Sequence, residues 1–533
     1  IRERKVKMMQ EQMTEVEELL DYTVQFINEF EELKKGTDSG KYKKIVEELM
    51  KRRMMIAEAG IDYLRYFKEI FKDDILLHTL VLSVLFFVFD EKALLEQIDE
   101  LMCSEKMPYD MAIGIRQQLG VMRFRNIDLD ITYERKRQLQ RVLLARLEKI
   151  LGESVPYVPY EERNHNCIVV ATDRLLSEAH APTRFVLSLA KCLQEELGYK
   201  IIVVADIEQT NTFEMEKYWF CPYIINGKSQ NDGIHTLSYE HCDLLVYQQV
   251  VDTLHLDEVK SGLQYIASLK PECVWYLGGD SVIRDLYRKM TVLVAMPCTA
   301  GYAVSEAQVL ASYMLSHSRQ EKVAEQYIVL HRQKKMMMIM NLPRQAKGNL
   351  YQKKQFGFSE DAFVIAIVGN RLDEEVTNEF QEIMCEIIER EKKISYVIIG
   401  NRTRSWREEL KDHVLELGFR DDFVEVMNIA DLFLNPIRKG GGGGAEVALR
   451  CNIPIVTLPD CDVASLVGDA FVCKSIEEVP IAVERYVKNQ VFYQNQVEEC
   501  KKRYKMYDQY DFATELQQGV KTVQQWAEHG EIV

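Results

Sequence analysis

The sequence has no excess of basic residues, because 67 Lys and Arg stand against 83 Asp and Glu, a formal net charge of −16. An acidic chain repels the phosphates of nucleic acids and anionic lipids, so we expect no nucleic-acid partner. The 12 cysteines include no CxxC pair and no His/Cys cluster with zinc spacing. They predict reduced thiols, a cytoplasmic protein and no structural zinc.

Long hydrophobic runs are also missing. The most apolar run, 75–89, has 15 residues and contains His78, whereas a bilayer helix needs about 20 apolar residues. We interpret this run as a buried bundle helix that begins at Asp73 and Asp74, and we expect no integral membrane segment. The charged start, Ile1-Arg2-Glu3-Arg4, carries no signal-peptide core. It has no initiator Met, which leaves open whether the chain begins inside a longer one.

Residues 1–155 have the pattern of an all-helical domain. Apolar side chains recur every seven residues at Val6, Met13, Leu20 and Ile27, which is typical of a long helix packed on a partner. The partner is either another helix of the same chain, in a bundle, or a helix of a second chain. In the second case the protein would be a homo- or hetero-oligomer.

From residue 160 onward, short apolar runs alternate with amphipathic stretches. This alternation predicts an α/β fold with parallel strands. One set spans 160–340, a second spans 345–485, and helices close the chain at 486–533. In the first set we expect strands at 167–171, 201–205, 244–247, 273–277 and 291–296 and a helix at 183–197. In the second set we expect strands at 363–368, 395–399, 431–434 and 453–457 and helices at 374–391, 405–417 and 445–451.

A glycine-rich segment gives the strongest local signal. The run Gly440–Gly444 follows a predicted strand and two cations, Arg438 and Lys439, and precedes a predicted helix. Glycines let a ligand approach the backbone closely, and a helix N-terminus attracts anions, so the segment predicts a diphosphate site. A flexible glycine hinge is the alternative. The chain has no GxxxxGK[ST] motif and no GxGxxG after its first strand, which excludes a P-loop NTPase and disfavours a dehydrogenase.

These residues resemble the donor-binding domain of GT-B-fold glycosyltransferases. The likeness lies in the glycine run with Asn435-Pro436 before it and Ile453-Pro454-Ile455-Val456 after it, and in Val368-Gly369-Asn370-Arg371-Leu372, which is similar to the family's Gly-Arg-Leu element. The segment His180-Ala181-Pro182-Thr183 stands where these enzymes face the acceptor. The resemblance covers about 160–500. It implies two facing Rossmann-like domains (GT-B), here preceded by an all-α domain.

The resemblance also implies roles in donor binding. Arg371, beside Asn370, would contact the donor phosphates together with Arg438 and Lys439. The backbone amides of Gly440, Gly441, Gly442, Gly443 and Gly444 would cradle the same phosphates. Glu446 would bind the ribose, or it is merely an acid at a helix N-terminus.

The chain departs from the family pattern at two positions. Arg438 stands where one retaining family has the first glutamate of its E-x7-E motif. Val376 stands where a lysine is usual, and Lys439 could supply that charge instead.

An inverting transfer needs a base near the acceptor, and His180 is the best candidate. A histidine there could instead cap the next helix or bind the acceptor without moving a proton, and Asp173 is a weaker alternative base. Thr183, Gly279 and Asp280 are expected on the acceptor side, although Gly279 and Asp280 could equally form a simple N-cap turn.

Two DxD sequences match a metal motif of other sugar-transferring enzymes. They are Asp128-Leu129-Asp130, interpreted as a loop that leads into a helix, and Asp460-Cys461-Asp462. The resemblance implies that the second loop is not a metal site. We expect no required metal, because cationic side chains and a helix N-terminus can stabilise a leaving diphosphate.

Composition and the resemblance together imply a cytoplasmic glycosyltransferase that needs no cofactor beyond its nucleotide-diphosphate sugar, with a UDP-sugar as the first candidate. The acceptor would be a protein or a glycan. One alternative is a non-catalytic GT-B protein that binds a glycosylated partner or chaperones an active transferase. The other is a nucleotide-sugar epimerase, which would act on the donor without an acceptor.

Overall fold

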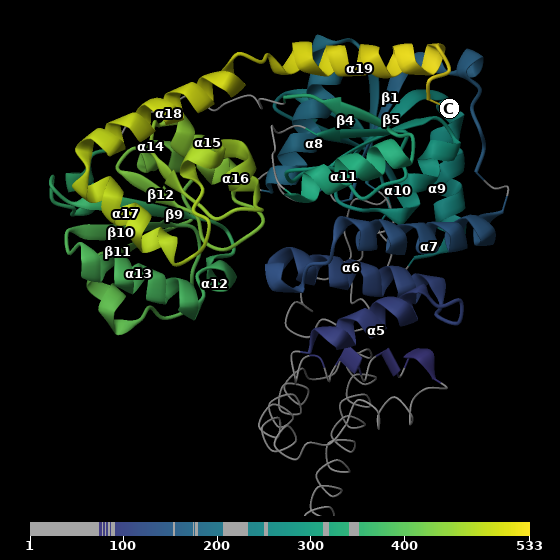
Figure 1. Ribbon diagram of the computed structural model, residues 1–533. Helices are drawn as coiled ribbons and strands as arrows, with labels where there is room; N and C mark the ends of the chain where they lie inside the picture. The colour runs from purple at the N-terminus through teal and green to yellow at the C-terminus, as the bar shows by residue number, and fades with distance from the viewer. Residues whose placement is uncertain are drawn as a thin grey trace, which may run out of the picture.

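The computed structural model describes residues 91–152, 155–173, 175, 180–205, 233–249, 254–312, 319–339 and 351–532, together with single positions and short stretches between 74 and 86. The apolar heptad repeat that begins at Val6 lies outside the described residues. Figure 1 shows two α/β bodies side by side, with a group of helices beneath one of them. Among the described residues, no helix is both long and apolar enough to cross a bilayer.

The helices beneath the first body are α5 (Lys92–Cys103), α6 (Tyr109–Arg125) and α7 (Tyr133–Leu151), and we call them the helical domain. Helix α7 begins after Thr132, whose hydroxyl accepts a hydrogen bond from the Arg135 amide (3.3 Å), a normal N-cap. The buried faces of the three helices share one continuous hydrophobic core with the adjacent α/β domain, from Ile98 and Leu143 to Val169 and Tyr276. The helical domain and that α/β domain therefore form one packed unit.

The N-terminal α/β domain contains an eight-stranded sheet in the order β3-β4-β2-β1-β5-β6-β7-β8. Its strands are β1 (Asn164–Thr172), β2 (Lys200–Ala205), β3 (Gly233–Tyr239), β4 (Cys242–Gln248), β5 (Pro271–Leu277), β6 (Val292–Met296), β7 (Val309–Ser312) and β8 (Lys334–Met337). The described helical elements around the sheet are α8 (Ala181–Lys191), the π-helix η3 (Cys192–Glu196), α9 (Leu256–Ser268), α10 (Val282–Asp285), η5 (Leu286–Lys289) and α11 (Arg319–Leu330). The five expected strands are confirmed, because buried parallel strands are continuous apolar runs.

Strand β3 is a departure from the predicted parallel sheet. It pairs antiparallel with β4 through a tight turn at Glu240 and His241, whose φ angles are +46° and +69°. Its exposure alternates along the strand, as expected of an edge strand with one face in solvent.

The C-terminal α/β domain contains a five-stranded parallel sheet in the order β11-β10-β9-β12-β13. Its strands are β9 (Phe363–Val368), β10 (Ile394–Ile399), β11 (Val414–Gly418), β12 (Leu432–Leu434) and β13 (Ile455–Val456). Its main helices are α12 (Leu372–Glu375), α13 (Asn378–Arg390), α14 (Phe423–Met427), α15 (Gly442–Arg450), α16 (Asp462–Val467) and α17 (Glu478–Lys488).

Two predicted helices of this domain are corrected. The expected helix 405–417 is wrong, because the segment forms the short 3-10 helix η7 (Glu408–His413) and then strand β11. The expected helix 374–391 is two helices, since the Thr377 hydroxyl accepts the Phe380 amide and starts a new helix at α13.

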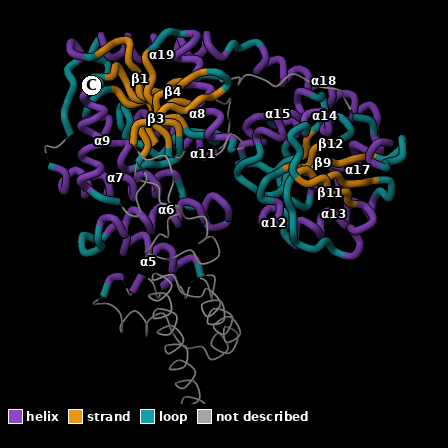
Figure 2. The backbone as a smooth tube through the Cα atoms, turned by 180° about the vertical axis from the view of Figure 1, so that it is seen from behind, coloured by secondary structure: helices purple, strands orange, loops and turns teal. Residues whose placement is uncertain are grey.

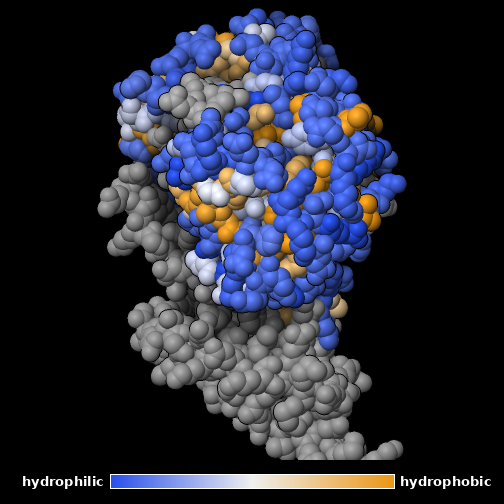
Figure 3. Space-filling model, turned by 90° about the vertical axis from the view of Figure 1, so that its left-hand side faces the viewer, coloured by the Kyte–Doolittle hydropathy of each residue, from blue (hydrophilic) through white to orange (hydrophobic). Residues whose placement is uncertain are grey.

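The closing helices join the two bodies. Helix α18 (Gln490–Asp508) lies on the C-terminal α/β domain, and α19 (Phe512–Glu528) crosses back to the N-terminal α/β domain, as both views show (Figures 1 and 2). Leu516 and Val520 of α19 are buried in the core of that domain. Gly519 permits the close approach, because a Cβ there would collide with the Met338 sulfur. The side of the molecule in Figure 3 is mostly hydrophilic, with scattered hydrophobic side chains.

Candidate functional site

The glycine-rich segment forms a turn between β12 and α15, at the carboxyl edge of the second sheet. Helix α15 begins at Gly442, inside the glycine run and earlier than the predicted 445. The amides of Gly442, Gly443 and Gly444 precede its first helical hydrogen bond, which Ala445 donates to Gly441 (3.2 Å). Amides in this position, at the positive end of the helix dipole, are groups that can bind an anion.

Gly441 is required by two independent features of this turn. Its φ is +101°, in the left-handed region, and a Cβ at this position would lie 2.5 Å from Nε of Arg438. The arginine therefore lies directly against the turn. The glycine run is a shaped turn and not merely a hinge.

Arg438 is buried beneath the turn, and its side chain is 4% exposed. Its Nη1 donates to Oε2 of Glu375 (2.6 Å), and its Nε donates to Oδ1 of Asn435 (2.8 Å). Within the described part of the chain, its Nη2 is buried and has no hydrogen-bond partner. A buried guanidinium nitrogen of this kind is costly unless it binds an acceptor.

Arg371 shares the same carboxylate. Its Nη2 lies 3.0 Å and its Nε 3.2 Å from Oε1 of Glu375. One buried glutamate therefore holds both predicted phosphate-binding arginines. Sequence reasoning missed Glu375, although its position four residues after Arg371 on a helical segment was a signal for an ion pair.

Two further glycines bring the ends of the neighbouring strands together here. A Cβ on Gly369, after β9, would lie 2.6 Å from Nη1 of Arg438. A Cβ on Gly400, after β10, would collide with the carbonyl oxygen of Gly369, and Gly400 has a φ of +132°. Both positions therefore need glycine. Asn370, which follows Gly369 in the chain, is exposed. Glu446 lies half-buried on α15.

Lys439 contacts the helical domain. Its Nζ lies 2.7 Å from Oδ2 of Asp130 and donates to the carbonyl oxygen of Arg123 (2.8 Å). Burial would raise the pKa of Asp130, but the charges of Lys136 and Lys439 outweigh burial and hold this pKa below its usual value. The DxD sequence that contains Asp130 thus has a lysine partner in another domain.

The same part of the helical domain contacts Arg371. The guanidinium carbon of Arg371 lies 4.9 Å from the ring centroid of Phe124, a cation–π distance. Gly440 fits between them, because a Cβ there would lie 3.4 Å from Nη2 of Arg371 and 3.9 Å from Cζ of Phe124.

Asp462 connects the two sheet edges. Its Oδ1 accepts a hydrogen bond from the amide of Ala300 (2.9 Å), which follows β6 in the other α/β domain. Burial raises the pKa of Asp462 to about 7, although this amide and the charges of Arg438 and Arg371 lower it. The thiol of Cys298 lies near this junction, and burial together with the carboxylates of Asp173 and Asp462 raises its pKa to about 12.

His180 stands at the N-cap of α8, which follows β1. Its Nδ1 is 2.9 Å from Oγ1 of Thr183, whose side chain is buried. The threonine hydroxyl therefore fixes the orientation of the imidazole ring.

Asp173, the weaker candidate base, accepts hydrogen bonds from two residues of its own domain. Its Oδ1 accepts from the Tyr276 hydroxyl (2.9 Å), and its Oδ2 accepts from the Gly279 amide (3.1 Å). The next residue, Asp280, has its carboxylate 3.5 Å from Arg116 of α6. The loop after β5 is thus tied both to the strand-end carboxylate and to the helical domain.

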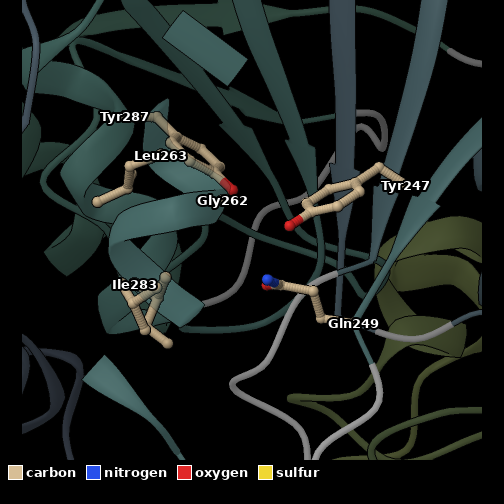
Figure 4. Close-up of a pocket in the computed structure, with 7 residues that line it drawn as sticks. Tyr247, Gln249, Gly262, Leu263, Ile283 and Tyr287 are labelled. Carbon is tan, nitrogen blue, oxygen red and sulfur yellow. The ribbon is translucent and has the colours of Figure 1, made fainter. Parts of the chain in front are cut away.

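A small pocket lies at the carboxyl end of β4, in the same α/β domain. Tyr247, Gln249, Gly262, Ile283 and Tyr287 are among its lining residues, and Figure 4 shows the tyrosine hydroxyls and the glutamine amide directed into it. This strand end belongs to the same sheet edge as the end of β1, which leads to His180. Among the residues that the structure describes, no group of three His, Cys, Asp or Glu side chains could hold a metal ion.

No family model and no curated protein sequence matches this chain. Among solved structures it is similar to a mutant of the O-GlcNAc transferase of Thermobaculum terrenum, with 12% identity, a TM-score of 0.51 and coverage of 91% of this chain and 98% of the other. It also matches a structure described as trehalose-6-phosphate from E. coli bound with UDP-2-fluoro glucose, with 9% identity, coverage of 67% and 99%, and a TM-score of 0.48. The catalytic domain of starch synthase IV from Arabidopsis thaliana matches with 10% identity, coverage of 68% and 99%, and a TM-score of 0.43. Together with the two α/β domains that meet at their strand ends, the first of these likenesses shows that the chain has the fold of the GT-B glycosyltransferases.

Proposed function

We propose that this chain is a glycosyltransferase that moves a sugar from a nucleotide-diphosphate sugar to an acceptor held by the N-terminal α/β domain. A UDP-sugar is the first donor to test, and a protein or glycan in the cytoplasm is the proposed acceptor. The observation that carries the proposal is the meeting of Arg371, Arg438 and the amides of Gly442–Gly444 at one sheet edge. Cations and helix-end amides at such an edge are the groups that stabilise a diphosphate.

The buried Nη2 of Arg438 supports this assignment. It has no acceptor within the described residues, and it lies against Gly441, whose hypothetical Cβ would be 2.7 Å away. A phosphate oxygen bound at the turn would supply an acceptor of the right charge.

The chemistry follows from these positions. Arg371, Arg438 and the helix amides would neutralise the charge that develops on the diphosphate as the bond to the sugar breaks. In an inverting transfer, Nε2 of His180 would accept the proton of the acceptor, with Thr183 holding Nδ1. In a retaining transfer, the donor phosphate and backbone groups would handle that proton instead.

A non-catalytic GT-B protein is the second candidate, and specific contacts favour it. Arg371 and Arg438 already share Glu375, and Lys439 is paired with Asp130. Val376, at the position of the family's lysine, is 1% exposed and belongs to the hydrophobic core. A protein with these features could bind a glycosylated partner without transferring a sugar.

The deciding experiment combines binding with turnover. The purified chain is screened by thermal shift against UDP, GDP, ADP, CMP and their sugar conjugates, because a ligand of the folded state raises Tm. Release of the nucleotide is then measured with and without candidate acceptors. Arg371→Ala should abolish the shift, whereas Arg390→Ala, which removes a surface arginine paired with Glu386 and Glu484, should leave it unchanged.

Each outcome selects one function. A shift with one donor and acceptor-dependent release of its nucleotide establish the transferase. A shift without release favours the non-catalytic protein, and conversion of the donor sugar without an acceptor identifies an epimerase. If no nucleotide shifts Tm, the proposed donor site is wrong.

A further inference from the structure

The helical domain reaches into the proposed donor site at the end of α6 and in the loop that follows. Its Asp130 carboxylate and Arg123 carbonyl oxygen both bind the Nζ of Lys439, at 2.7 and 2.8 Å. Its Phe124 ring covers the guanidinium of Arg371 at 4.9 Å. Two of the three cations next to the glycine turn therefore contact the helical domain.

We propose that this contact is autoinhibitory: the helical domain holds Lys439 away from the diphosphate site, and an anion bound at the glycine turn displaces Asp130 from Lys439. The inference deepens the proposed function and rests on it for the identity of the anion as a donor diphosphate. The anion site itself needs only the turn and its cations.

The charges at the turn support this exchange. Arg371 and Arg438 share Glu375, and Lys439 is neutralised by Asp130. The two arginines therefore keep one net positive charge, and Lys439 adds none while it is paired with Asp130, so a diphosphate brings more negative charge than the site can neutralise. The diphosphate binds more tightly once Asp130 leaves Lys439, because an excess negative charge in a partly buried site is costly.

Asp130 is the carboxylate that can leave. Glu375 belongs to the same domain as both arginines and contacts each of them, so it cannot leave without rearranging that domain. Asp130 belongs to another domain, so a small relative movement of the two bodies separates it from Lys439 without rearranging either core. Lys439 is then free to turn toward the phosphates, from a position one residue before the glycine run.

The segment that carries Asp130 is held firmly on its own side. Arg123 forms a bidentate ion pair with the buried Asp99 of α5, with Nη1 3.1 Å from Oδ1 and Nη2 2.7 Å from Oδ2. This pair anchors the end of α6. Lys136 of α7 binds Asp130 at 2.9 Å, so Asp130 keeps a partner after Lys439 leaves. This second lysine makes the exchange feasible, because no buried charge is left unpaired.

The helical domain is fixed to the N-terminal α/β domain by polar contacts as well as by the shared core. Gln140 of α7 donates to the Asp285 carboxylate (2.7 Å), and Arg141 binds Glu306 (2.8 Å). Opening the Asp130–Lys439 contact is therefore the same movement as opening the two α/β domains. The contact couples the state of the donor site to the separation of the domains.

The test uses inorganic pyrophosphate as the probe and isothermal titration calorimetry on the full chain. Asp130→Asn removes the charge that competes for Lys439 and should tighten pyrophosphate binding about 5- to 10-fold. Asp128→Asn is the matched control, since it makes the same change two residues away at an exposed position. It should leave the affinity unchanged.

A second readout needs no variant. If pyrophosphate displaces Asp130, amide hydrogen exchange of the wild-type chain should become faster in 123–130 when the probe binds. If Asp130→Asn does not fold, the double variant Asp130→Asn/Lys136→Gln replaces it in the titration. The double variant also removes the charge of Lys136, which would otherwise lose its carboxylate partner.

The outcomes separate this inference from the proposed function. Weaker or unchanged pyrophosphate binding in Asp130→Asn, no binding to any variant, or slower exchange in 123–130 would overturn the inference. Tighter pyrophosphate binding without binding of any nucleotide sugar would support the inference and reject the proposed function. Tighter binding of both supports both.

Discussion

The carboxylate of Asp462 accepts a hydrogen bond of 2.9 Å from the backbone amide of Ala300, which joins the two α/β domains at their strand ends. Burial raises the pKa of this carboxyl to about 7, against the opposing effect of the amide and of Arg438 and Arg371. Because this carboxyl lies beside cations proposed to bind phosphate, binding of the proposed donor should depend on pH near neutrality.

We expect the affinity for a UDP-hexose to fall as the pH rises from about 6 to about 8, because an ionised Asp462 repels the diphosphate. The drop should be about 3- to 10-fold, measured by calorimetry at fixed ionic strength. Asp462→Asn should flatten the profile, since the amide oxygen can still accept from Ala300. Asp460→Asn, two residues earlier and exposed, should keep the slope. A sloping profile in Asp462→Asn would assign the effect to another group.

The same group predicts a pH dependence of stability. The pKa of Asp462 is higher in the folded than in the unfolded chain, so the folded state binds more protons between about pH 4 and pH 7. The free energy of unfolding should decrease across this window as the pH rises, by up to about 4 kcal/mol. Denaturant unfolding of wild type and Asp462→Asn at pH 5 and pH 8 measures it. If the variant gains no relative stability at pH 8, Asp462 is not the responsible group.

Gly441→Ala should damage the anion site more than any other alanine substitution in the glycine run. The left-handed backbone costs a side chain about 1–2 kcal/mol, and the new Cβ would lie 2.5 Å from Arg438, which must shift. Gly443→Ala is the matched control, because its Cβ would have no neighbour within 4 Å. Pyrophosphate binding and Tm, measured on both, should fall only for Gly441→Ala. Equal loss in both variants would mean that the glycine run serves flexibility and not shape.

Glu375→Gln tests whether one carboxylate neutralises both arginines. The variant keeps the shape of the side chain but removes a buried charge shared by Arg371 and Arg438, so the free energy of unfolding should drop by about 1–3 kcal/mol without ligand. Added pyrophosphate should recover more stability in the variant than in the wild type, because it replaces the lost negative charge. Thermal shift with and without pyrophosphate measures this. Glu374→Gln, exposed on the same helix, is the control.

The sequence was sufficient to predict the strands that are buried on both faces. Strand β9 runs from Phe363 to Val368, as expected, since an unbroken apolar run of this length has few other interpretations. The glycine turn with Arg371 and Arg438 was equally recognisable, because its residues have special backbone and charge properties. Edge elements were harder. Strand β11 is only half-buried, so its sequence lacks the unbroken apolar run of a central strand and predicts part of a helix. Pairing with β10 decides its conformation instead.

Contacts between distant segments could not be predicted. Asp130 and Lys439 lie in different domains, and no local pattern records their meeting. The same holds for Asp462 and Ala300. From the sequence alone, Asp130 belongs to a loop that leads into a helix, and Lys439 is expected to contact the phosphates. Tertiary packing gave both residues a role that only the folded chain reveals.

His180→Ala should separate catalysis from donor binding. If His180 is the base, turnover falls about 10²- to 10⁴-fold, while the thermal shift by the donor stays, because the donor cations belong to the other α/β domain. Thr183→Val should lower turnover less, because it removes only the 2.9 Å contact between Oγ1 of Thr183 and Nδ1 of His180 and leaves the imidazole in place. His165→Ala, at the opposite end of β1 and paired with Glu272, is the control. Turnover close to wild type in His180→Ala would contradict the role of base and favour a retaining transfer, in which the donor phosphate handles the proton.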